Sequence, residues 1–304
     1  MATFGKATFD AAIYASFRPT YPRSLFDFIF RYHEGAKGAR WDRAVDLGCG
    51  TGQATVELTP FKKVTGVDPS AGMIASAREA LEAQHISTGQ FDYVQSGAEK
   101  LGFLEDGSVD LMIAAQAGHW FDWSKMWPEA ARVLRKGGSA AFWIYSEFRF
   151  SQYPALTPLI NQYAQGSDPV NSLGPHWQQP GRSILENHLV EVPEANAVVP
   201  GQFCDFERVF FTGSHYPELA SPRSVILRKK MSWDDLLSYL HTWSSLHTFH
   251  ERNPEDKQRP EGDIALRFWR SLMEHAQKEE GTEVQGKDEV EIEWPLAVMM
   301  VKKA

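Results

Sequence analysis

The chain has 304 residues, enough for one large α/β domain or for a domain with a subdomain. Its formal net charge of −8 argues against a nucleic-acid partner and against an anionic membrane surface. Two cysteines cannot build a disulfide framework, and we find neither a signal-like leader nor an apolar run long enough to span a bilayer. We therefore expect a cytoplasmic protein.

The first half of the chain alternates between strand-like and helix-like segments. An amphipathic helix is predicted over residues 23–34, after an aromatic and proline-rich stretch. Strands are then predicted at about 42–47, 63–68, 91–95, 109–115 and 139–145, and helices at 53–60, from 70 to beyond 81, and at 122–134. Strands that alternate with helices favour parallel βαβ units with right-handed crossovers.

The second half is less regular. Residues 146–205 contain several prolines and little periodicity, and we interpret them as an insertion over the carboxyl edge of the sheet. Strands are predicted at 206–212 and 224–230, a helix from Trp233 to Trp243 capped by Ser232, a helix over 262–279, and terminal strands over 289–302 interrupted at Pro295. The expected fold is a doubly wound, mostly parallel seven-stranded α/β sheet with an inserted cap.

This pattern predicts four segments. Residues 1–40 would form an N-terminal lid with helices, and residues 41–145 a cofactor-binding α/β core. Residues 146–205 would form a substrate cap, and residues 206–304 would complete the sheet and add helical elements of a substrate pocket.

A glycine-rich stretch follows the first predicted strand. In Val45–Gly52, three glycines alternate with other residues, at Gly48, Gly50 and Gly52. Glycine allows a tight reversal and a close approach of a ligand to the backbone. Unpaired amides at the start of a following helix favour a negative group. The stretch therefore predicts a cradle for a small ligand.

The spacing of the stretch discriminates between three ligands. A phosphate-binding loop ends in Gly-Lys-Ser/Thr, whereas this turn continues with Gln53 and Ala54. A dinucleotide fold has Gly-x-Gly-x-x-Gly, and here Gln53 stands in place of the last glycine. The third ligand, S-adenosylmethionine, offers an amino-acid end, a ribose and an adenine. Asp68, which ends the second strand, can accept hydrogen bonds from two ribose hydroxyls of a dinucleotide or of S-adenosylmethionine, so it does not discriminate between them. The glycine spacing and Asp46 favour S-adenosylmethionine.

Four motifs resemble those of the class I S-adenosylmethionine-dependent methyltransferases. Val45–Gly52 resembles their motif I, and Gly66-Val67-Asp68-Pro69-Ser70-x-x-Met73 resembles their acidic second motif. Gly97-Ala98-Glu99 resembles the segment beside the adenine, and residues 132–138 resemble the turn before their fifth strand. The resemblance, together with the residues above, implies a set of cofactor-binding positions: Tyr14, Arg18, Asp46, Gly48, Gly50, Gly52, Asp68, Pro69, Ser70, Met73, Ala98, Glu99 and Gln116.

A narrower resemblance concerns three further stretches. Tyr14-Ala15-x-x-Arg18-Pro19-x-Tyr21-Pro22, residues 115–122 (Ala-Gln-Ala-x-His-Trp-Phe-Asp) and residues 239–245 (Tyr-Leu-x-Thr-Trp-Ser-Ser) resemble the trans-aconitate methyltransferase-like branch. The known substrates of that branch are small carboxylic acids. The resemblance implies that Tyr14 and Arg18 close over the methionine end of the cofactor, with Arg18 pairing its carboxylate.

The acceptor side is predicted from polar and aromatic residues. We expect Gln116, His119 and Trp120 to position the reacting groups rather than to transfer protons, because a carboxylate acceptor is already ionised at neutral pH. Candidate walls of the acceptor pocket are Trp120, Trp143, Tyr145, Trp177, Trp243 and His247. Aromatic residues at helical spacing also serve as core residues, so each alone is a weak indication.

Several alternatives remain open. The acceptor atom could instead be a hydroxyl, an amine or a carbon. A phenol or alcohol acceptor would need a general base, and His119 could be that base, an orienting donor or a structural histidine. We find no cysteine and histidine spacing typical of a metal site. A methyltransferase fold can also serve as a non-catalytic scaffold. The expected partner is a small-molecule acceptor, with no nucleic acid and no membrane, and both a monomer and a homodimer are compatible with the sequence.

Overall fold

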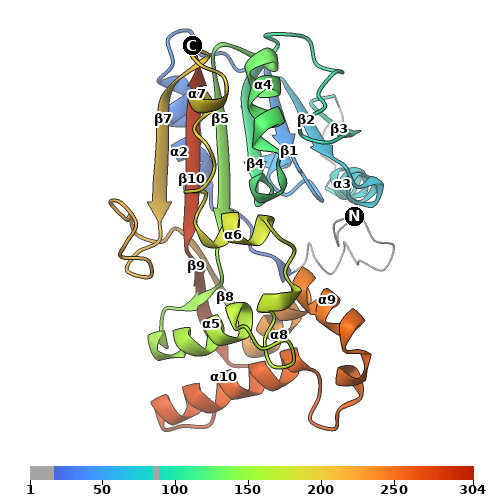
Figure 1. The fold of residues 1–304 in the computed structure, drawn as a ribbon, viewed down its shortest axis with the longest axis vertical. Coiled ribbons are helices and arrows are strands. Elements are labelled where there is room, and N and C mark those ends of the chain that lie inside the picture. Colours follow the sequence, from blue (N-terminus) through green and yellow to red (C-terminus); the bar gives the residue numbers. More distant parts are fainter. Residues whose placement is uncertain (1–16, 85–88) are drawn as a thin grey trace. The chain divides into compact units, whose positions relative to one another are not determined.

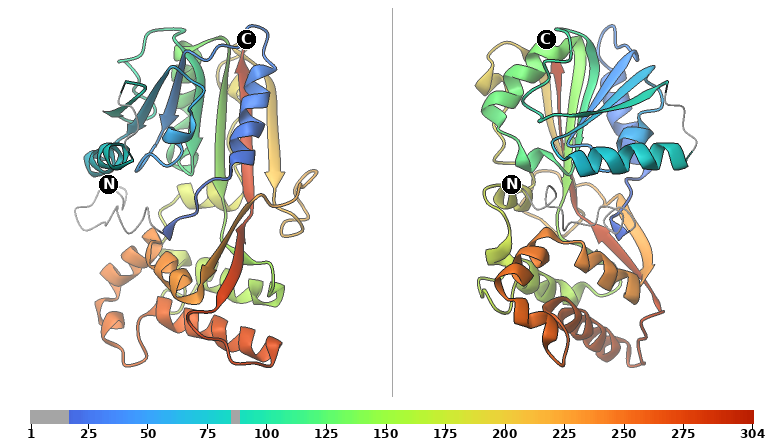
Figure 2. Two further views of the ribbon diagram at one scale, coloured as in Figure 1. Left: turned by 180° about the vertical axis from the view of Figure 1, so that it is seen from behind. Right: turned by 90° about the vertical axis from the view of Figure 1, so that its right-hand side faces the viewer.

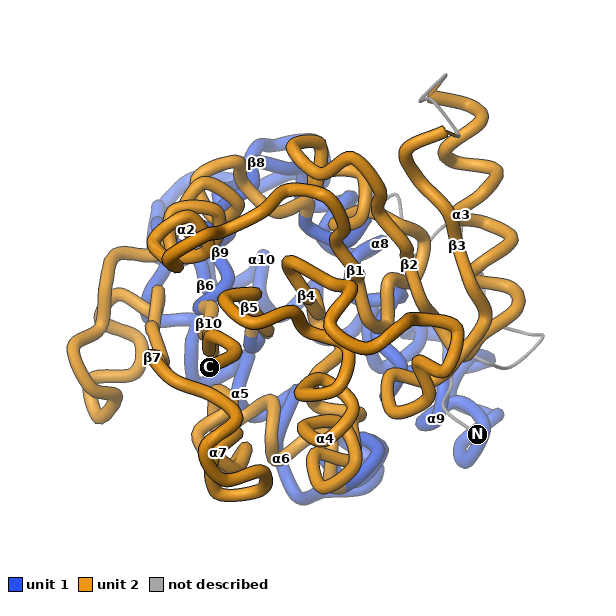
Figure 3. Tube along the Cα trace, turned by 90° about the horizontal axis from the view of Figure 1, so that it is seen from above, with its two compact units in different colours: residues 1–19, 146–179, 227–295 blue, residues 20–145, 180–226, 296–304 orange. Residues whose placement is uncertain are grey.

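The structure, a computed structural model, describes residues 17–84 and 89–304. These residues form two compact units, which are coloured separately in Figure 3. Unit 2 holds residues 20–145, 180–226 and 296–304, and unit 1 holds residues 146–179 and 227–295 with the N-terminal residues up to Pro19. The segment 146–205, which we expected to form one insertion, is therefore divided between the two units after Gln179.

Unit 2 is built on a seven-stranded sheet in the order β3-β2-β1-β4-β5-β10-β7 (Figure 1). The first five strands are parallel, and β10 is antiparallel to both β5 and β7. This arrangement confirms the predicted α/β class with a mostly parallel seven-stranded sheet. The strands are β1 (Arg43–Leu47), β2 (Lys63–Asp68), β3 (Phe91–Gln95), β4 (Val109–Ala115), β5 (Leu134–Tyr145), β7 (Phe203–Phe211) and β10 (Leu296–Lys303).

Helices cover both faces of this sheet. Helix α2 (Arg23–Glu34) lies on one face, and α4 (Trp123–Val133) with α7 (Ala195–Val198) lies on the other (Figure 2). Phe142 of β5 meets Trp127 of α4 at a ring-centroid distance of 5.7 Å, whereas the next residue, Trp143, meets Phe26 of α2 at 5.9 Å. Both faces of β5 are thus buried, which explains its continuous apolar sequence. Helices α3 (Ala71–Ala83) and α6 (Gly181–Glu186) complete the unit's helices within the described residues.

The strand order fixes where a ligand can bind. From β1 the chain moves outward to β2 and β3, and it then returns to β4 on the other side of β1. In open α/β sheets, ligands bind beyond the carboxyl ends of the strands at such a reversal. The segments after β1, β2 and β4 therefore flank the predicted position of a cofactor.

Unit 1 has a small antiparallel sheet and an aromatic core. Its sheet has the order β6-β9-β8, with β6 (Arg149–Phe150), β8 (Leu227–Ser232) and β9 (Glu289–Trp294). Its helices are α5 (Thr157–Gln165), α8 (Trp233–His241), α9 (Ser244–Arg252) and α10 (Ile264–Glu280). The Trp294 indole donates to the Tyr239 hydroxyl at 3.0 Å inside this core. Ser232 caps α8 as predicted, in a capping box with Asp235.

The structure corrects two local predictions. The helix expected at 53–60 is reduced to a 3-10 turn, η2 (Thr55–Glu57). Gly52 has a left-handed φ of +86°, which is not a helical conformation. Pro60 disfavours helical backbone at Thr59. Too few residues remain between Gly52 and Thr59 for an α-helix. Strand β5 begins at Leu134, not at Ser139, because the glycine turn forms an irregularity within it, with Gly137 at a φ of +78°.

Among the residues that the structure describes, no helix has both the length and the apolar character needed to cross a bilayer.

Candidate functional site

The three glycines of the turn after β1 have different roles. All three have a positive φ, of +67° at Gly48, +55° at Gly50 and +86° at Gly52. A Cβ on Gly48 would lie 2.4 Å from the Ala117 Cβ, and a Cβ on Gly52 would lie 2.4 Å from the Tyr93 hydroxyl oxygen. Among the described residues, no atom would lie within 4 Å of a Cβ on Gly50. Gly48 and Gly52 therefore allow close packing, whereas Gly50 faces open space where a ligand can approach the backbone.

The amides of the turn bind other protein groups. The N–H groups of Gly48 and Cys49 both donate to the Val67 carbonyl, at 2.7 and 3.0 Å. The Gly50 N–H donates to Asp68 Oδ2 at 3.0 Å. The predicted α-helix start is wrong, because a 3-10 turn follows the glycines, and the N–H groups of Gly48, Cys49 and Gly50 already have acceptors. The turn is instead pinned to the end of β2.

Asp68 stands at the centre of this arrangement. Its Oδ1 accepts the Ser70 N–H at 2.8 Å and its Oδ2 accepts the Gly50 N–H, so two backbone segments orient the carboxylate. Burial raises the pKa of this carboxyl, and the two N–H donors oppose that effect. An ionised carboxylate has about four acceptor positions, so each oxygen of Asp68 retains capacity for a further donor.

Asp46 lies beneath the turn and is fully buried. Its Oδ2 accepts the Thr55 hydroxyl at 2.7 Å, which anchors the 3-10 turn that follows the glycines. Its Oδ1 has no hydrogen-bond partner among the described residues. The pKa of Asp46 is raised to about 7. Burial is the main cause, the hydrogen bond from the Thr55 hydroxyl opposes it, and the charge of Asp68 adds to it. Sequence reasoning missed Thr55 and Tyr93, which pack under the turn, because neither belongs to a motif.

One contact joins the segment after β4 to the turn, and another joins the segments after β3 and η3 (Gly118–Trp120). Ala117, which follows β4, packs against Gly48, and Glu99, which follows β3, accepts the Asp122 N–H on Oε1 at 2.9 Å. Ser70 caps α3 by accepting the Met73 N–H at 3.4 Å. The remaining predicted cofactor positions of this region are exposed Pro69 and the buried side chains of Met73 and Ala98.

Gln116 occupies a constrained position at the end of β4. It has a left-handed φ of +54°, and its side-chain amide pairs with the Tyr145 backbone. Oε1 accepts the Tyr145 N–H at 2.7 Å, and Nε2 donates to the Tyr145 carbonyl at 3.0 Å. Gln116 thus extends the pairing of β4 with β5 by one side chain, and this contact fixes the main chain of Tyr145.

The chain has recognisable relatives. A family model described as a methyltransferase domain matches residues 45–142. A protein of Saccharomyces cerevisiae named as an S-adenosylmethionine-dependent methyltransferase is 28% identical over 270 residues, covering 88% of each chain. A protein of Dictyostelium discoideum named as a methyltransferase is 30% identical over 244 residues, covering 80% of this chain and 78% of that one. The chain belongs to the class I S-adenosylmethionine-dependent methyltransferases.

Two further similarities qualify this result. The solved structure of a type II methyltransferase from Anaeromyxobacter dehalogenans, so described, aligns with a TM-score of 0.64 and 25% identity, over 94% of this chain and 98% of that one. A trans-aconitate 2-methyltransferase of Azoarcus is 40% identical over 101 residues, which is 32% of this chain and 36% of that protein. The solved structure supports the methyltransferase fold along nearly the whole chain. The similarity to the trans-aconitate enzyme extends over about a third of the chain.

The residues of this methyltransferase fit its cofactor, S-adenosylmethionine. Open space beside Gly50 leaves room for a ligand against the backbone, and Asp68 retains two acceptor positions that suit a pair of ribose hydroxyls. Asp46 is fully buried beneath the turn, and among the described residues it supports the turn by accepting the hydrogen bond of the Thr55 hydroxyl.

The predicted acceptor residues of unit 2 follow β4 or lie in β5. His119 and Trp120 belong to the 3-10 turn η3 (Gly118–Trp120), with ring centroids 4.6 Å apart. His119 is 8% exposed, whereas Trp120 is half-buried. Trp143 is fully buried against α2, and Tyr145 is 3% exposed.

The other predicted residues belong to unit 1. Trp177 and Trp243 pack with their ring centroids 5.5 Å apart, and Trp243 is 3% exposed. His247 lies 3.2 Å from Glu251 on α9. Arg18 donates to the Thr242 carbonyl at 3.1 Å and lies over the Tyr239 ring. Tyr14 lies outside the described residues, so its predicted role stays a prediction, as do those of Arg18 and the pocket residues.

Proposed function

We propose that this methyltransferase methylates an oxygen of a small carboxylic acid. The observation that carries the proposal is the stretch Ala115–Asp122, which follows β4 beside the glycine turn and resembles the trans-aconitate methyltransferase-like branch. The partial similarity to a trans-aconitate 2-methyltransferase supports it. In this proposal, the acceptor is oriented by Gln116, His119 and Trp120.

The chemistry requires little from the protein beyond positioning. When bound, S-adenosylmethionine supplies an electrophilic methyl group on a sulfonium sulfur, and the new carbon–oxygen bond forms as the carbon–sulfur bond breaks. A carboxylate is ionised at neutral pH, since its ordinary pKa is about 4, so no proton has to be removed. Holding the two reactants in line is then the main contribution of the chain.

A competing function is methylation of a hydroxyl, amine or carbon atom. A hydroxyl acceptor requires a general base, and such a base contributes roughly 10² to 10⁴ in rate. His119 is the candidate, because it is buried in the turn after β4. A third possibility is a non-catalytic scaffold, which predicts the same fold but no turnover of any acceptor.

The experiment is an acceptor screen with S-adenosylmethionine. Purified protein is incubated with carboxylic acids, including trans-aconitate, and with phenols and amines, and the products are tested for loss of the methyl group in mild base. We expect a base-labile methyl ester from an acid. A base-stable product from a phenol or amine, with no ester from any acid, would overturn the proposal, and binding of the cofactor without turnover would favour the scaffold.

A His119→Asn variant separates the two enzymatic functions. If the acceptor is a carboxylate, kcat should remain within roughly tenfold of the wild type and should not depend on pH between 6 and 8. If His119 removes a proton, kcat should fall by about 10² or more. Lys125→Met is a suitable control, since Lys125 is exposed on α4 nearby in the sequence and pairs only with Asp122 among the described residues.

A further inference from the structure

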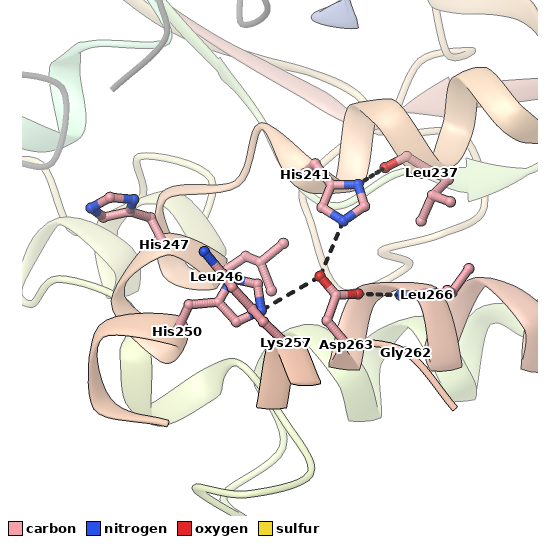
Figure 4. A pocket seen from close by; sticks show the side chains of 9 residues that line it. All are labelled: Leu237, His241, Leu246, His247, His250, Lys257, Gly262, Asp263 and Leu266. Carbon is pink, nitrogen blue, oxygen red and sulfur yellow. Dashed lines mark hydrogen bonds and ion pairs between the residues drawn. The ribbon is translucent and has the colours of Figure 1, made fainter. Parts of the chain in front are cut away.

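Unit 1 contains a pocket whose lining includes one of the predicted acceptor residues, His247. It lies where α8, α9 and the start of α10 meet, and its volume is about 470 Å³. Volumes of 300 to 1,000 Å³ are typical of small-molecule sites. Four cationic or ionisable nitrogen side chains and one carboxylate line it together with three leucines: His241, His247, His250, Lys257, Asp263, Leu237, Leu246 and Leu266 (Figure 4).

The carboxylate of Asp263 is already engaged by the protein. Its Oδ1 caps α10 by accepting the Leu266 N–H at 2.8 Å. Its Oδ2 lies 3.2 Å from His241 Nε2 and 3.5 Å from His250 Nε2, and Figure 4 shows both rings directed at it. A cationic ligand would have to compete with these groups for Asp263.

His241 lies between two acceptor groups. Its Nδ1 lies 3.0 Å from the Leu237 carbonyl, and its Nε2 faces Asp263 at 3.2 Å. The ring therefore helps to hold one oxygen of Asp263 in place.

Lys257 supplies a positive charge to the lining. It forms no ion pair with any described residue. Asp256, the nearest acid in the chain, is instead paired with Arg259 at 3.3 Å and with Arg267 at 2.9 Å. The pocket thus combines an ammonium group that no described acid pairs with and an apolar wall of three leucines.

The same residues do not suit a metal ion. Both histidines point at a carboxylate oxygen that they already contact, and they leave no common point between them. Within residues 17–84 and 89–304, no group of three His, Cys, Asp or Glu side chains is arranged to hold a metal. An anion with an apolar body matches the lining better.

We propose that this pocket binds a small monocarboxylic acid, with its carboxylate beside Lys257 and His250 and its alkyl chain against Leu237, Leu246 and Leu266. The site does not depend on methyl transfer, and it is defined by unit 1 alone. The bound acid is either the methyl acceptor or a separate ligand, and the experiment below distinguishes these.

Binding should be linked to protonation of His250. Its side chain is 9% exposed, and the groups that face it are Asp256, Asp263, Lys257 and His241, with Arg259 and Arg267 behind Asp256. Burial lowers the pKa of His250, and the positive charges of Lys257 and His241 lower it further, against the two acids. A bound carboxylate favours the protonated ring, so binding takes up a proton and strengthens as the pH falls.

The test is calorimetric titration of the full chain with hexanoate and with hexanamide, its neutral analogue, in the absence of S-adenosylmethionine. We expect hexanoate to bind more tightly than hexanamide, and more tightly at pH 6 than at pH 8. Lys257→Met should weaken hexanoate binding by at least about fivefold and leave hexanamide unchanged. Lys278→Met, which removes an exposed lysine in the last turn of α10, is the matched control and should bind like the wild type.

His250→Asn should remove the pH dependence while the protein remains folded, as judged by circular dichroism. Failure of hexanoate to bind the wild type, or equal binding by Lys257→Met, would overturn the site whatever the acceptor screen shows. If bound hexanoate yields methyl hexanoate once S-adenosylmethionine is added, it is the acceptor. If it binds without conversion, it is a separate ligand of the same pocket.

Discussion

Asp68 in unit 2 and Asp263 in unit 1 are both oriented carboxylates, but different groups hold them. Asp68 is held by two backbone N–H groups, from Gly50 and Ser70. Asp263 is held by one backbone N–H and by the rings of His241 and His250. Burial raises the pKa of Asp68. Burial also acts on Asp263, yet the hydrogen bond from His241, the Leu266 N–H and the two histidine charges lower its pKa to about 2.

This difference has a functional consequence. Backbone donors keep their charge and position at every pH at which the protein is folded, so they suit a site that must hold one cofactor. Histidine partners change charge near neutral pH, so they make a site sensitive to pH. We therefore expect substitutions at the first site to affect cofactor binding, and substitutions at the second to affect stability and its pH dependence.

The largest expected effect is that of Asp68→Ala. If Asp68 binds two ribose hydroxyls, the variant loses two charge-assisted hydrogen bonds of about 1.5 to 3 kcal/mol each, or roughly a thousandfold in affinity. Calorimetric titration with S-adenosylmethionine measures this, and Glu79→Ala on the exposed side of α3 is the control. Unaltered affinity of Asp68→Ala would remove Asp68 from the cofactor site.

Asp46→Asn should stabilise the protein above neutral pH. The folded-state pKa of Asp46, about 7, lies above its unfolded value, so the stability of the wild type declines as the pH rises from about 4 through 7. An asparagine has no charge to bury and can still accept the Thr55 hydroxyl. The gain, about 2 kcal/mol at pH 8, should nearly vanish at pH 5. Urea unfolding at the two pH values measures it, and an equal gain at both would contradict the buried-charge explanation.

Gly52→Ala and Gly50→Ala should distinguish a glycine needed for packing from a glycine that lets a ligand approach the backbone. At Gly52 the new methyl group meets Tyr93, and we expect a loss of about 2 kcal/mol in unfolding free energy. At Gly50 the methyl group enters open space, so the loss should be about 1 kcal/mol, whereas affinity for S-adenosylmethionine should fall more strongly. Thermal unfolding and titration of both variants give the comparison. Normal cofactor affinity in folded Gly50→Ala would show that the ligand does not approach there.

Asp263→Asn should lower stability in a pH-dependent way. Because the folded-state pKa of Asp263 is lowered to about 2, its contribution is complete above about pH 4 and is lost as the pH falls towards 2. Asparagine can still cap α10, so we expect a loss of about 1 to 2 kcal/mol at pH 6 that shrinks at pH 3. Urea unfolding checks this against Glu274→Gln on the exposed side of α10. A loss that does not change with pH would mean that the charge of Asp263 is unimportant.

The sequence by itself determined the cofactor half of this protein. Strands β2, β3 and β4 have the bounds that periodicity predicts, and the glycine spacing with Asp46 indicated S-adenosylmethionine. These features are readable because they are local: a strand, its turn and the acid after the next strand follow one another closely in the chain. The same local reasoning wrongly extended a helix after Gly52, because the competing contact of Thr55 with Asp46 joins residues on either side of the turn.

Only the tertiary structure decided the rest. It showed that Gly48 and Gly52 are needed for packing while Gly50 faces open space, that Gln116 is bound to the Tyr145 backbone, and that Trp143 is enclosed by α2. It also placed His241, His250, Lys257 and Asp263 around one pocket from four successive segments. Such contacts depend on how helices pack, and packing is set by side chains that are distant in the sequence. No sequence motif therefore predicts them.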